Sequence, residues 1–340
     1  MNVLVTGGCG FIGSALVRNL LRQTDWTVVN IDCLTYAGHV ESLEEGLEHP
    51  RHHLIRKHIA DREAMDAAFA EFQPMAVMHL AAESHVDRSL TGPAEFIHTN
   101  ILGTYTLLEA ARSHFGKLDA AGKAKFRFLH VSTDEVFGAL GPTGQFTEET
   151  RYDPHSPYSA SKASADHLAR AWHHSYGLPV LVTNCSNNYG PFQFPEKLIP
   201  VVIRKALAEQ PIPVYAKGEN VRDWLHVDDH VSALLRVLNA GQIGETYAIG
   251  GRAEVRNIDL VQVICEVLDE LRPRSSGTKH AELISFVSDR PGHDFRYAID
   301  CSKIERELGW KQSVTFREGM RSTVEWYLAN QTWVEAVLKP

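Results

Sequence analysis

A glycine-rich turn near the start of the chain constrains its fold more than any other feature. The apolar run Val3–Val5 reads as a strand, and glycines follow at Gly7, Gly10 and Gly13, where an amphipathic stretch begins. A glycine turn between a strand and a helix lets the backbone approach a pyrophosphate, whose charge is stabilised by the helix N-terminus. The last glycine permits close packing of the helix on the strand. The sequence therefore predicts a dinucleotide site at this turn.

The first half of the chain continues the alternation that the turn begins. Strand-like runs occupy 2–6, 27–31, 54–57, 76–80, 126–132 and 180–184, and helical patterns occupy 11–23, 61–72, 93–116 and 158–176. Pro93 suits a helix start, and Gly177 suits a helix stop. This pattern predicts an α/β fold, a doubly wound parallel Rossmann sheet with helices on both faces.

Beyond residue 184 the pattern changes to loops rich in Pro, Asn and aromatic residues. Helical segments follow near 197–209, 227–240, 258–272 and 316–329, and the run 246–249 is expected to return to the first sheet. The acidic stretch 41–48 reads as a solvated helical face. We expect a dinucleotide-binding Rossmann domain from 1–184 and about 227–250. A smaller, interleaved substrate-binding lobe is expected from about 185–226 and 251–340.

Composition excludes several classes of protein. Hydrophobic residues make up 44% of the 340 residues and charged residues 22%, which is typical of a soluble globular protein. A net charge of −8 opposes nucleic-acid binding. The chain shows no signal peptide and no membrane-length apolar segment, so we expect a cytoplasmic protein without membrane contact.

Cysteine and histidine spacing argues against metal. The five cysteines are odd in number, scattered and never in a C-x-x-C pair, and we interpret them as reduced, buried thiols. The 18 histidines include no zinc-binding spacing. No metal is therefore expected.

Asp32 ends the second predicted strand, 19 residues after Gly13. A carboxylate there can accept hydrogen bonds from the adenosine ribose hydroxyls and would repel a ribose 2′-phosphate, which favours NAD over NADP. The segment His79–Ala82 ends another strand and should border the cofactor. His79 itself fits a buried core histidine equally well.

Tyr158 and Lys162 place a phenol and an ammonium four residues apart, on one face of a helix. A lysine cation favours the phenolate, so Tyr158 could take a proton from a sugar hydroxyl as hydride leaves the same carbon. The Y-x-x-x-K pattern is common by chance. Its position behind a nucleotide motif makes a catalytic role much stronger.

Thr133, Asp134 and Glu135 follow a predicted strand, at the edge where ligands approach an open α/β sheet. Thr133 could bind a sugar oxygen, and the two carboxyl groups could be held in different protonation states, one as acid and one as base. The alternative is a polar strand end that caps a helix.

These motifs together resemble the dTDP-glucose 4,6-dehydratases, a branch of the extended short-chain dehydrogenase/reductase family. The resemblance covers nearly the whole chain and runs through segments 6–13, 81–87, 132–136, 158–162, 184–191, 194–200, 222–224 and 289–294. It implies C4 oxidation with Tyr158 as base, then removal of the C5 proton by Glu135. Protonated Asp134 would donate to the departing C6 hydroxyl before hydride returns to C6. The implied substrate is dTDP-glucose and the product dTDP-4-keto-6-deoxy-glucose, with tight retention of NAD.

The same resemblance implies which residues bind. Catalytic residues would be Thr133, Asp134, Glu135, Tyr158 and Lys162. NAD contacts would be Gly7, Gly10, Phe11, Ile12, Gly13, Asp32, Leu34, Thr35, His58, Ile59, Leu80, Ala81, Ala82, Ser84, Thr99, Tyr158, Lys162 and Asn188. Substrate contacts would be Ser84, His85, Thr133, Asn187, Glu196, Lys197, Leu198, Pro213, Tyr215, Arg222, Asn257, Arg290 and His293. Lys197 also fits ordinary surface charge, and Tyr215 fits aromatic core packing.

One departure from the family pattern lies at His58, where relatives usually present an Asp beside adenine.

The resemblance also implies a homodimer, packed through the helices around 93–116 and 158–176. Three alternatives stay open: a nucleotide-sugar 4-epimerase, which does not need Asp134 and Glu135; a dehydratase for a UDP or CDP sugar; and a catalytically silent NAD-binding regulator.

Overall fold

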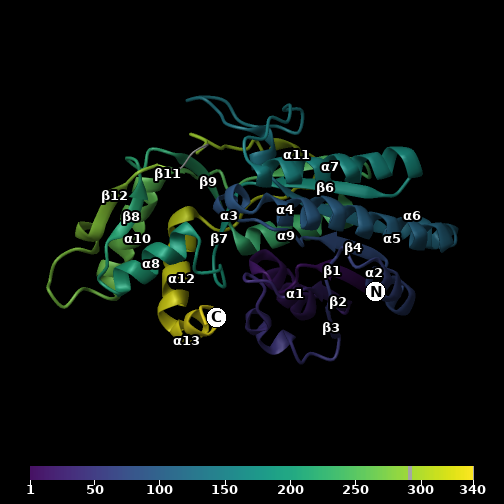
Figure 1. The fold of residues 1–340 in the computed structure, drawn as a ribbon, viewed down its shortest axis with the longest axis horizontal. Coiled ribbons are helices and arrows are strands. Elements are labelled where there is room, and N and C mark those ends of the chain that lie inside the picture. Colours follow the sequence, from purple (N-terminus) through teal and green to yellow (C-terminus); the bar gives the residue numbers. More distant parts are fainter. Residues whose placement is uncertain (290–292, 340) are drawn as a thin grey trace.

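The computed structural model describes residues 1–289 and 293–339, and its centre is a seven-stranded parallel sheet (Figure 1). The strand order is β10-β6-β5-β4-β1-β2-β3. The strands are β1 Asn2–Thr6, β2 Thr27–Asp32, β3 His52–Arg56, β4 Ala76–His79, β5 Arg127–Thr133, β6 Val180–Cys185 and β10 Thr246–Ile249. The order reverses between β1 and β4, which is where ligands bind in doubly wound sheets. The predicted fold class and the return of 246–249 to the first sheet are confirmed.

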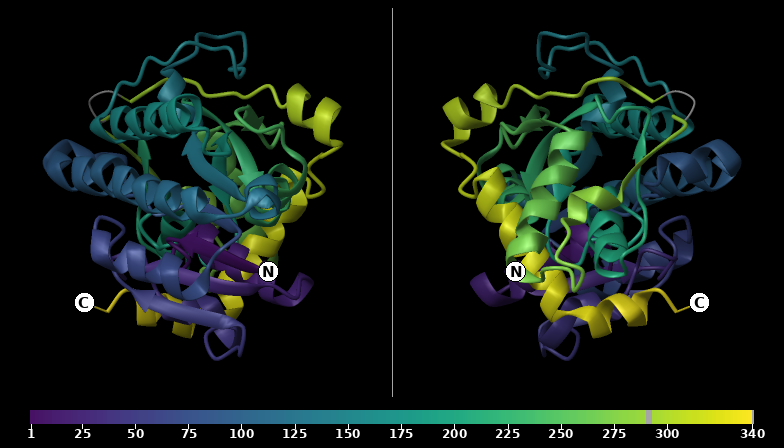
Figure 2. Two further views of the ribbon diagram at one scale, coloured as in Figure 1. Left: turned by 90° about the vertical axis from the view of Figure 1, so that its right-hand side faces the viewer. Right: turned by 90° about the vertical axis from the view of Figure 1, so that its left-hand side faces the viewer.

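Helices cover both faces of this sheet (Figure 2). On one face lie α1 Phe11–Gln23, α9 Val227–Ala240 and α11 Ser302–Leu308, whose apolar side chains share one core cluster with the strands. On the other lie α2 Arg62–Phe72, α5 Thr104–Lys117 and α7 Pro157–Tyr176. The short α3 Val86–Thr91 and α6 Ala120–Lys125 complete this half.

Local sequence explains where α7 starts and stops. Ser156 accepts a hydrogen bond from the Ser159 backbone N–H in a capping box, Pro157 occupies the first turn, and Gly177 ends the helix with a φ of 67°. These caps fix α7 over the sheet and with it Tyr158 and Lys162.

The predicted helix 93–116 is not one regular helix. It consists of α4 Pro93–Phe96, a π-helical segment Ile97–Gly103 and then α5. Asn100 in this segment bonds the backbone of Glu83, and Gly103 lies so close to Ile59 that a Cβ would overlap it. The π-helix therefore follows from tertiary contacts that periodicity does not contain.

The acidic stretch is likewise a 3₁₀ segment, Val40–Gly46, instead of an open helical face. Glu44 and Glu45 form ion pairs with Arg22 on α1, at 3.2 and 2.6 Å. These charges are thus partly neutralised by the neighbouring helix.

A second group of elements has its own apolar core, at the left of Figure 1. Its helices are α8 Leu198–Leu207, α10 Asn257–Leu271, α12 Phe316–Ala329 and α13 Gln331–Val337. Its strands are β7 Asn187–Tyr189, β9 Val221–His226 and β11 Glu254–Arg256 in one sheet, and β8 Ile212–Tyr215 and β12 Ile284–Val287 in another. Two short 3₁₀ segments, Asp134–Phe137 and His280–Leu283, complete the elements.

Candidate active site

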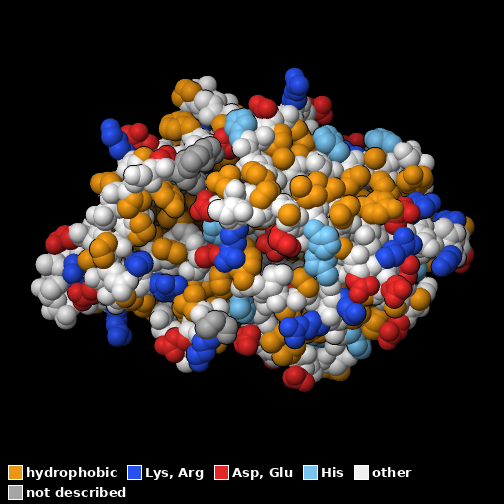
Figure 3. All heavy atoms as spheres, viewed as in Figure 1, with side chains coloured by type: hydrophobic (Ala, Val, Ile, Leu, Met, Phe, Trp, Pro, Cys, Tyr) orange, Lys and Arg blue, Asp and Glu red, His pale blue; other side chains and the backbone are white. Residues whose placement is uncertain are grey.

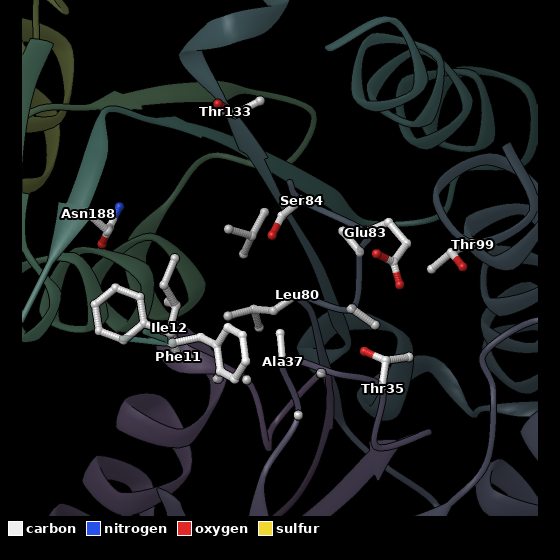
Figure 4. A pocket seen from close by; sticks show the side chains of 18 of the residues that line it. Phe11, Ile12, Thr35, Ala37, Leu80, Glu83, Ser84, Thr99, Thr133 and Asn188 are labelled. Atoms are coloured by element: carbon white, nitrogen blue, oxygen red, sulfur yellow. The ribbon is translucent and has the colours of Figure 1, made fainter. Parts of the chain in front are cut away.

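A cavity of about 320 Å³ opens at the carboxyl ends of β1, β4, β5 and β6 (Figure 4). Side chains from α1, from the loop after β2 and from the loop after β4 lie on one side, and Thr133 and Asn188 come from later strands. The cavity thus lies where the strand order reverses. Its lining includes these predicted residues: Gly7, Gly10, Phe11, Ile12, Gly13, Asp32, Thr35, His58, Ile59, Leu80, Ala81, Ala82, Ser84, Thr99, Thr133, Asp134, Glu135, Tyr158, Lys162, Asn187, Asn188, Glu196 and Lys197.

The glycine turn has the shape that a dinucleotide requires. Gly7 has a φ of 72°, which favours glycine, and a Cβ on Gly13 would overlap the carbonyl of Gly7. Helix α1 begins at Phe11 with no acidic residue in its first turn and no side-chain cap. Its N–H groups are therefore available to stabilise a phosphate.

Asp32 is buried at the end of β2 and is held by two backbone donors. The N–H groups of Cys9 and Leu34 donate to its carboxylate at 2.9 and 2.8 Å. Burial raises the pKa of Asp32, and these two hydrogen bonds oppose the shift. The carboxylate is thus oriented on the cavity wall, while Leu34 stands behind it and does not line the cavity.

His58 is fixed within its own loop. Its Nδ1 accepts from the Ala60 backbone N–H at 3.0 Å, so the proton lies on Nε2, which donates to the Thr99 hydroxyl at 3.1 Å. The ring also stacks on His98 with centroids 4.8 Å apart. His58 therefore joins the β3 loop to the π-helical segment at the cavity edge.

His79 is a core residue. Its ring bonds the hydroxyls of Thr6 at 2.7 Å and Thr104 at 2.9 Å, is fully buried and does not line the cavity. Leu80, Ala81 and Ala82 do line it. His79 is therefore a core histidine, whereas the three residues after it face the cavity.

Thr133, Asp134 and Glu135 lie at the end of β5 and the start of a 3₁₀ turn. The Thr133 hydroxyl caps the turn by accepting from the Glu135 N–H at 3.3 Å, so the capping interpretation is also correct. Asp134 is fully buried, and this burial, with the charges of Glu135 and Asp223, raises its pKa well above the ordinary value. Arg222 opposes the shift. Asp134 therefore favours its protonated form, while Glu135 is half-buried beside it.

Tyr158 and Lys162 lie on the buried face of α7, and both line the cavity. The Lys162 ammonium donates to the Val131 carbonyl at 2.9 Å. Burial and the charge of Glu135 raise the pKa of Tyr158 well above 10, although a hydrogen bond with Thr133 opposes this. The predicted lowering of the Tyr158 pKa is therefore wrong in direction, because burial and the neighbouring negative charges raise it.

Segment 192–197 contributes Gln193, Phe194, Glu196 and Lys197 to the wall of the cavity. The Phe194 ring stacks on His39 at 5.4 Å and meets Tyr36 edge-on at 5.8 Å. Farther along, Glu196 pairs with Arg88 at 3.4 Å, and Lys197 donates to the Ser84 carbonyl at 3.2 Å. The segment therefore connects the later loops to the Rossmann half on both sides of the opening.

Some predicted contacts do not line this cavity. His85 lies 3.8 Å from Glu196, and Arg222 donates to the Asp294 carbonyl at 2.9 Å while its guanidinium covers the Tyr297 ring. Tyr215 is exposed and faces His293 edge-on at 6.0 Å. Leu198, Pro213 and Asn257 also lie outside the lining, and Arg290 lies outside the described residues. The roles of these residues stay predictions.

Sequence reasoning missed several lining residues and one that supports the lining. Cys185, Ser186, Gln193 and Phe194 line the cavity from the later loops. Asn100 donates to the Ser161 hydroxyl at 2.8 Å and so joins the π-helical segment to α7. Only the position of 184–191 after a strand could have pointed to Cys185 and Ser186.

The glycine turn, Asp32 and the Tyr158/Lys162 pair, brought together on a doubly wound sheet, define a dinucleotide-binding protein of the short-chain dehydrogenase/reductase class. The chain belongs to the family described as GDP-mannose 4,6 dehydratase, whose sequence model matches residues 4–323. A dTDP-glucose 4,6-dehydratase of Shigella flexneri is 57% identical over 346 residues, covering 99% of this chain and 95% of that protein. The resemblance predicted from the motifs is confirmed.

Solved structures agree. A dTDP-glucose 4,6-dehydratase from Streptomyces venezuelae with NAD and TYD bound has a TM-score of 0.89 and 42% identity, and the match covers 99% of this chain and 100% of that chain. One from Bacillus anthracis in complex with NAD has a TM-score of 0.88 and 41% identity, covering 99% of both chains.

Proposed function

We propose that this chain is an NAD-dependent hydro-lyase that converts dTDP-glucose to dTDP-4-keto-6-deoxy-glucose and water. The observation that carries the proposal is one cavity that holds the Tyr158/Lys162 pair and the carboxyl groups of Asp134 and Glu135 beside a dinucleotide turn. Oxidation of an alcohol needs one base, whereas elimination of water needs a second base and an acid. An epimerase would not need that second pair.

The residues of the cavity fit NAD. The glycine cradle leaves no room for a Cβ at Gly13, and the oriented Asp32 carboxylate can accept from ribose hydroxyls. Leu80, Ala81, Thr99 and Asn188 would line the rest of its site. When bound, NAD accepts hydride from C4 of the sugar and later returns it to C6.

The side chains of the protein perform the proton transfers. Tyr158 accepts the O4 proton as the phenolate, a form that burial disfavours and that the Lys162 ammonium on the same helix face stabilises. The C4 ketone acidifies the C5 proton, which Glu135 removes and then returns to C5 when hydride reaches C6. Asp134 is held protonated by burial, so it can donate to the departing C6 hydroxyl.

Substrate recognition divides between two regions. Ser84, Thr133 and Asn187 would bind the glucosyl group, with His85, Glu196 and Leu198 at its border. Lys197, Arg222 and Arg290 would offset the diphosphate charge.

For the base, Tyr215 and Pro213 would provide a stacking surface, with His293 beside them. Asn257 has a buried side-chain oxygen without a partner among the described residues, which supports a role as an acceptor there.

Segment 192–197 supports tight retention of the cofactor. Its contacts with Tyr36, His39 and Arg88 hold it against the Rossmann half, beside the cavity in which NAD would lie. Retention matters because loss of the reduced cofactor would strand the keto sugar before hydride returns.

Three structural expectations belong to this proposal. A homodimer through the helices around 93–116 and 158–176 is supported by exposed apolar side chains there, Ile97, Leu102, Tyr105 and Tyr176. Figure 3 shows hydrophobic side chains gathered over this part of the surface. A strict monomer in light scattering would contradict the dimer.

The division into two lobes at residues 184, 227 and 250 is supported by the two separate apolar cores. Ile304 and Leu308 pack in the first core, so we assign α11 to the Rossmann part and not to the 251–340 segment.

A cytoplasmic location is supported by five free cysteines, Cys9, Cys33, Cys185, Cys265 and Cys301. Among the described residues, none of the helices has the length and apolar character needed to span a membrane.

A substrate panel tests the proposal. NAD-loaded protein is incubated with dTDP-glucose, UDP-glucose or GDP-mannose without added reductant, and products are identified by mass spectrometry. We expect loss of water from dTDP-glucose, and Tyr158→Phe should abolish it. Preferential dehydration of another nucleotide sugar would replace the substrate, and isomerisation without mass change would indicate an epimerase. No turnover of any sugar would indicate a regulator.

A further inference from the structure

Asp166 is a fully buried carboxylate directly behind the Tyr158/Lys162 pair. Tyr158, Lys162 and Asp166 follow one another at intervals of four residues along α7, which places them on one face of the helix. The first two line the cavity and Asp166 does not. Asp166 therefore cannot touch the substrate, and any effect on the reaction must pass through Lys162.

Neutral groups hold both oxygens of Asp166. His130 on β5 bonds Oδ1 at 2.9 Å, while the Tyr152 hydroxyl donates to Oδ2 at 2.7 Å and Asn184 on β6 donates to the same oxygen at 3.3 Å. Burial lowers the pKa of His130, so its ring favours the neutral form. A buried carboxylate held only by neutral donors would cost several kcal/mol unless a cation lies nearby.

Two cations lie on the same helix, on either side of Asp166. Arg170 donates to the Tyr152 hydroxyl at 2.8 Å and stands on the side away from the cavity. Lys162 stands on the cavity side, where burial lowers its pKa and the charge of Asp166 is the largest opposing influence. Although burial acts to raise the pKa of Asp166, the hydrogen bond from neutral His130 and the charge of Lys162 bring it below its ordinary value.

We propose that Asp166 is a positioning residue, the buried counter-ion that keeps Lys162 charged and thereby sets the pH range in which Tyr158 accepts the substrate proton. This inference rests on the proposed function for Tyr158. It adds a third group to the Tyr158/Lys162 pair, at a depth that no ligand reaches. A counter-ion so placed keeps the ammonium charged in a site where burial alone would favour the neutral amine.

The pH dependence includes the other groups that face these side chains. The groups that face Tyr158 are Glu135, Asp134, Thr133 and Cys185. Cys185 also faces Lys162. None of these changes in an Asp166 variant. Asp166→Asn keeps the size of the side chain and replaces its negative charge with a neutral amide. Loss of that charge disfavours the ammonium of Lys162, so Lys162 should lose its proton at lower pH. A neutral Lys162 stabilises the Tyr158 phenolate less, so Tyr158 should lose its proton at higher pH.

The test titrates Tyr158 directly and does not require turnover. The ultraviolet absorbance of tyrosinate is followed against pH in NAD-loaded protein, and the same titration of a Tyr158→Phe partner is subtracted. With Asp166→Asn we expect the Tyr158 midpoint to rise by about one pH unit. In the pH profile for C4 oxidation, the limb that reports Tyr158 should move to higher pH and the limb that reports Lys162 to lower pH. Tyr152→Phe, which removes a neutral hydrogen bond from the same carboxylate, should leave the midpoint near the wild-type value.

A purely structural role for Asp166 predicts a different result. The rate or the stability would then fall at every pH, with the Tyr158 midpoint and both limbs in place, and this would overturn the proposal. Asp166→Ser, which is smaller and neutral, provides the same test if the Asn variant does not fold. The proposed function fails separately, through absence of dehydration by the wild-type protein, because the titration needs no substrate.

Discussion

The protonated state of Asp134 can be tested by replacing it with asparagine. The Asp134 carboxyl group is fully buried, and the Thr133 hydroxyl lies 3.3 Å from its Oδ1. Burial, Glu135 and Asp223 raise its pKa well above the ordinary value, against the influence of Arg222. Asparagine has the same shape and cannot ionise. The variant therefore cannot pay a free-energy cost for an ionised side chain at this position. It also lacks the acidic proton that the reaction needs.

The expected change in stability follows from linkage. Asp134 ionises near pH 4 in the unfolded chain but stays protonated in the folded protein, so its contribution to stability is complete below pH 4 and is lost as pH rises toward its folded pKa. Each pH unit in that range costs the wild type about 1.4 kcal/mol. Solvent screening does not reduce this free energy, because the Asp134 carboxyl group is fully buried. Between the unfolded and the folded pKa of Asp134, the free energy of unfolding of Asp134→Asn should therefore gain on the wild type by about that amount per pH unit.

Urea unfolding of the NAD-loaded proteins at several pH values measures this difference. In parallel, C4 oxidation is followed by the absorbance of the reduced nicotinamide, and water loss by mass spectrometry. We expect oxidation to persist and water loss to slow about 10²- to 10⁴-fold. If the free energies of unfolding of the two proteins changed in parallel with pH, the reasoning would be refuted. That result would mean that Asp134 is already ionised in the folded protein. Unchanged water loss would refute its role as the acid.

Three further variants test other parts of the site. Glu135→Gln should bind sugar and oxidise C4 but lose exchange of the C5 proton with solvent, as measured by deuterium incorporation. Gly13→Ala should cost about 1–3 kcal/mol of packing at the turn and lower the NAD content of purified protein. The matched control is Gly116→Ala, where a Cβ meets nothing within 4 Å, and full NAD content in both variants would contradict the cradle. Tyr215→Ala should raise KM for dTDP-glucose about two- to tenfold without changing NAD content, and an unchanged KM would remove Tyr215 from the base site.

Much of the Rossmann half could be predicted from sequence because its signals are local. Apolar runs such as Val28–Ile31, the caps Ser156 and Gly177, and the glycine turn each specify their own structure. The helix bounds of α1 agree with the predicted 11–23. The meeting of Thr133, Tyr158 and Lys162 at one cavity could be predicted as well, since they occupy strand and helix ends that a parallel sheet brings to one edge.

The second half was harder because its strands are short and tertiary contacts determine them. β7 has three residues and lies parallel to β9 more than 30 positions later, a pairing that no local pattern contains. Burial also reversed the expected direction of the Tyr158 shift, and burial is a property of the packed site. His58 shows the same limit: its hydrogen bonds to Ala60 and Thr99 depend on two segments that meet only in the fold.

Turnover in heavy water tests the central claim most directly. NAD-loaded protein is incubated with dTDP-glucose in heavy water without reductant, and the product is analysed by mass spectrometry. Oxidation, elimination and hydride return on one cofactor predict loss of water with deuterium at C5 and no accumulation of reduced nicotinamide. Conversion without loss of mass, or water loss without deuterium at C5, would contradict the account.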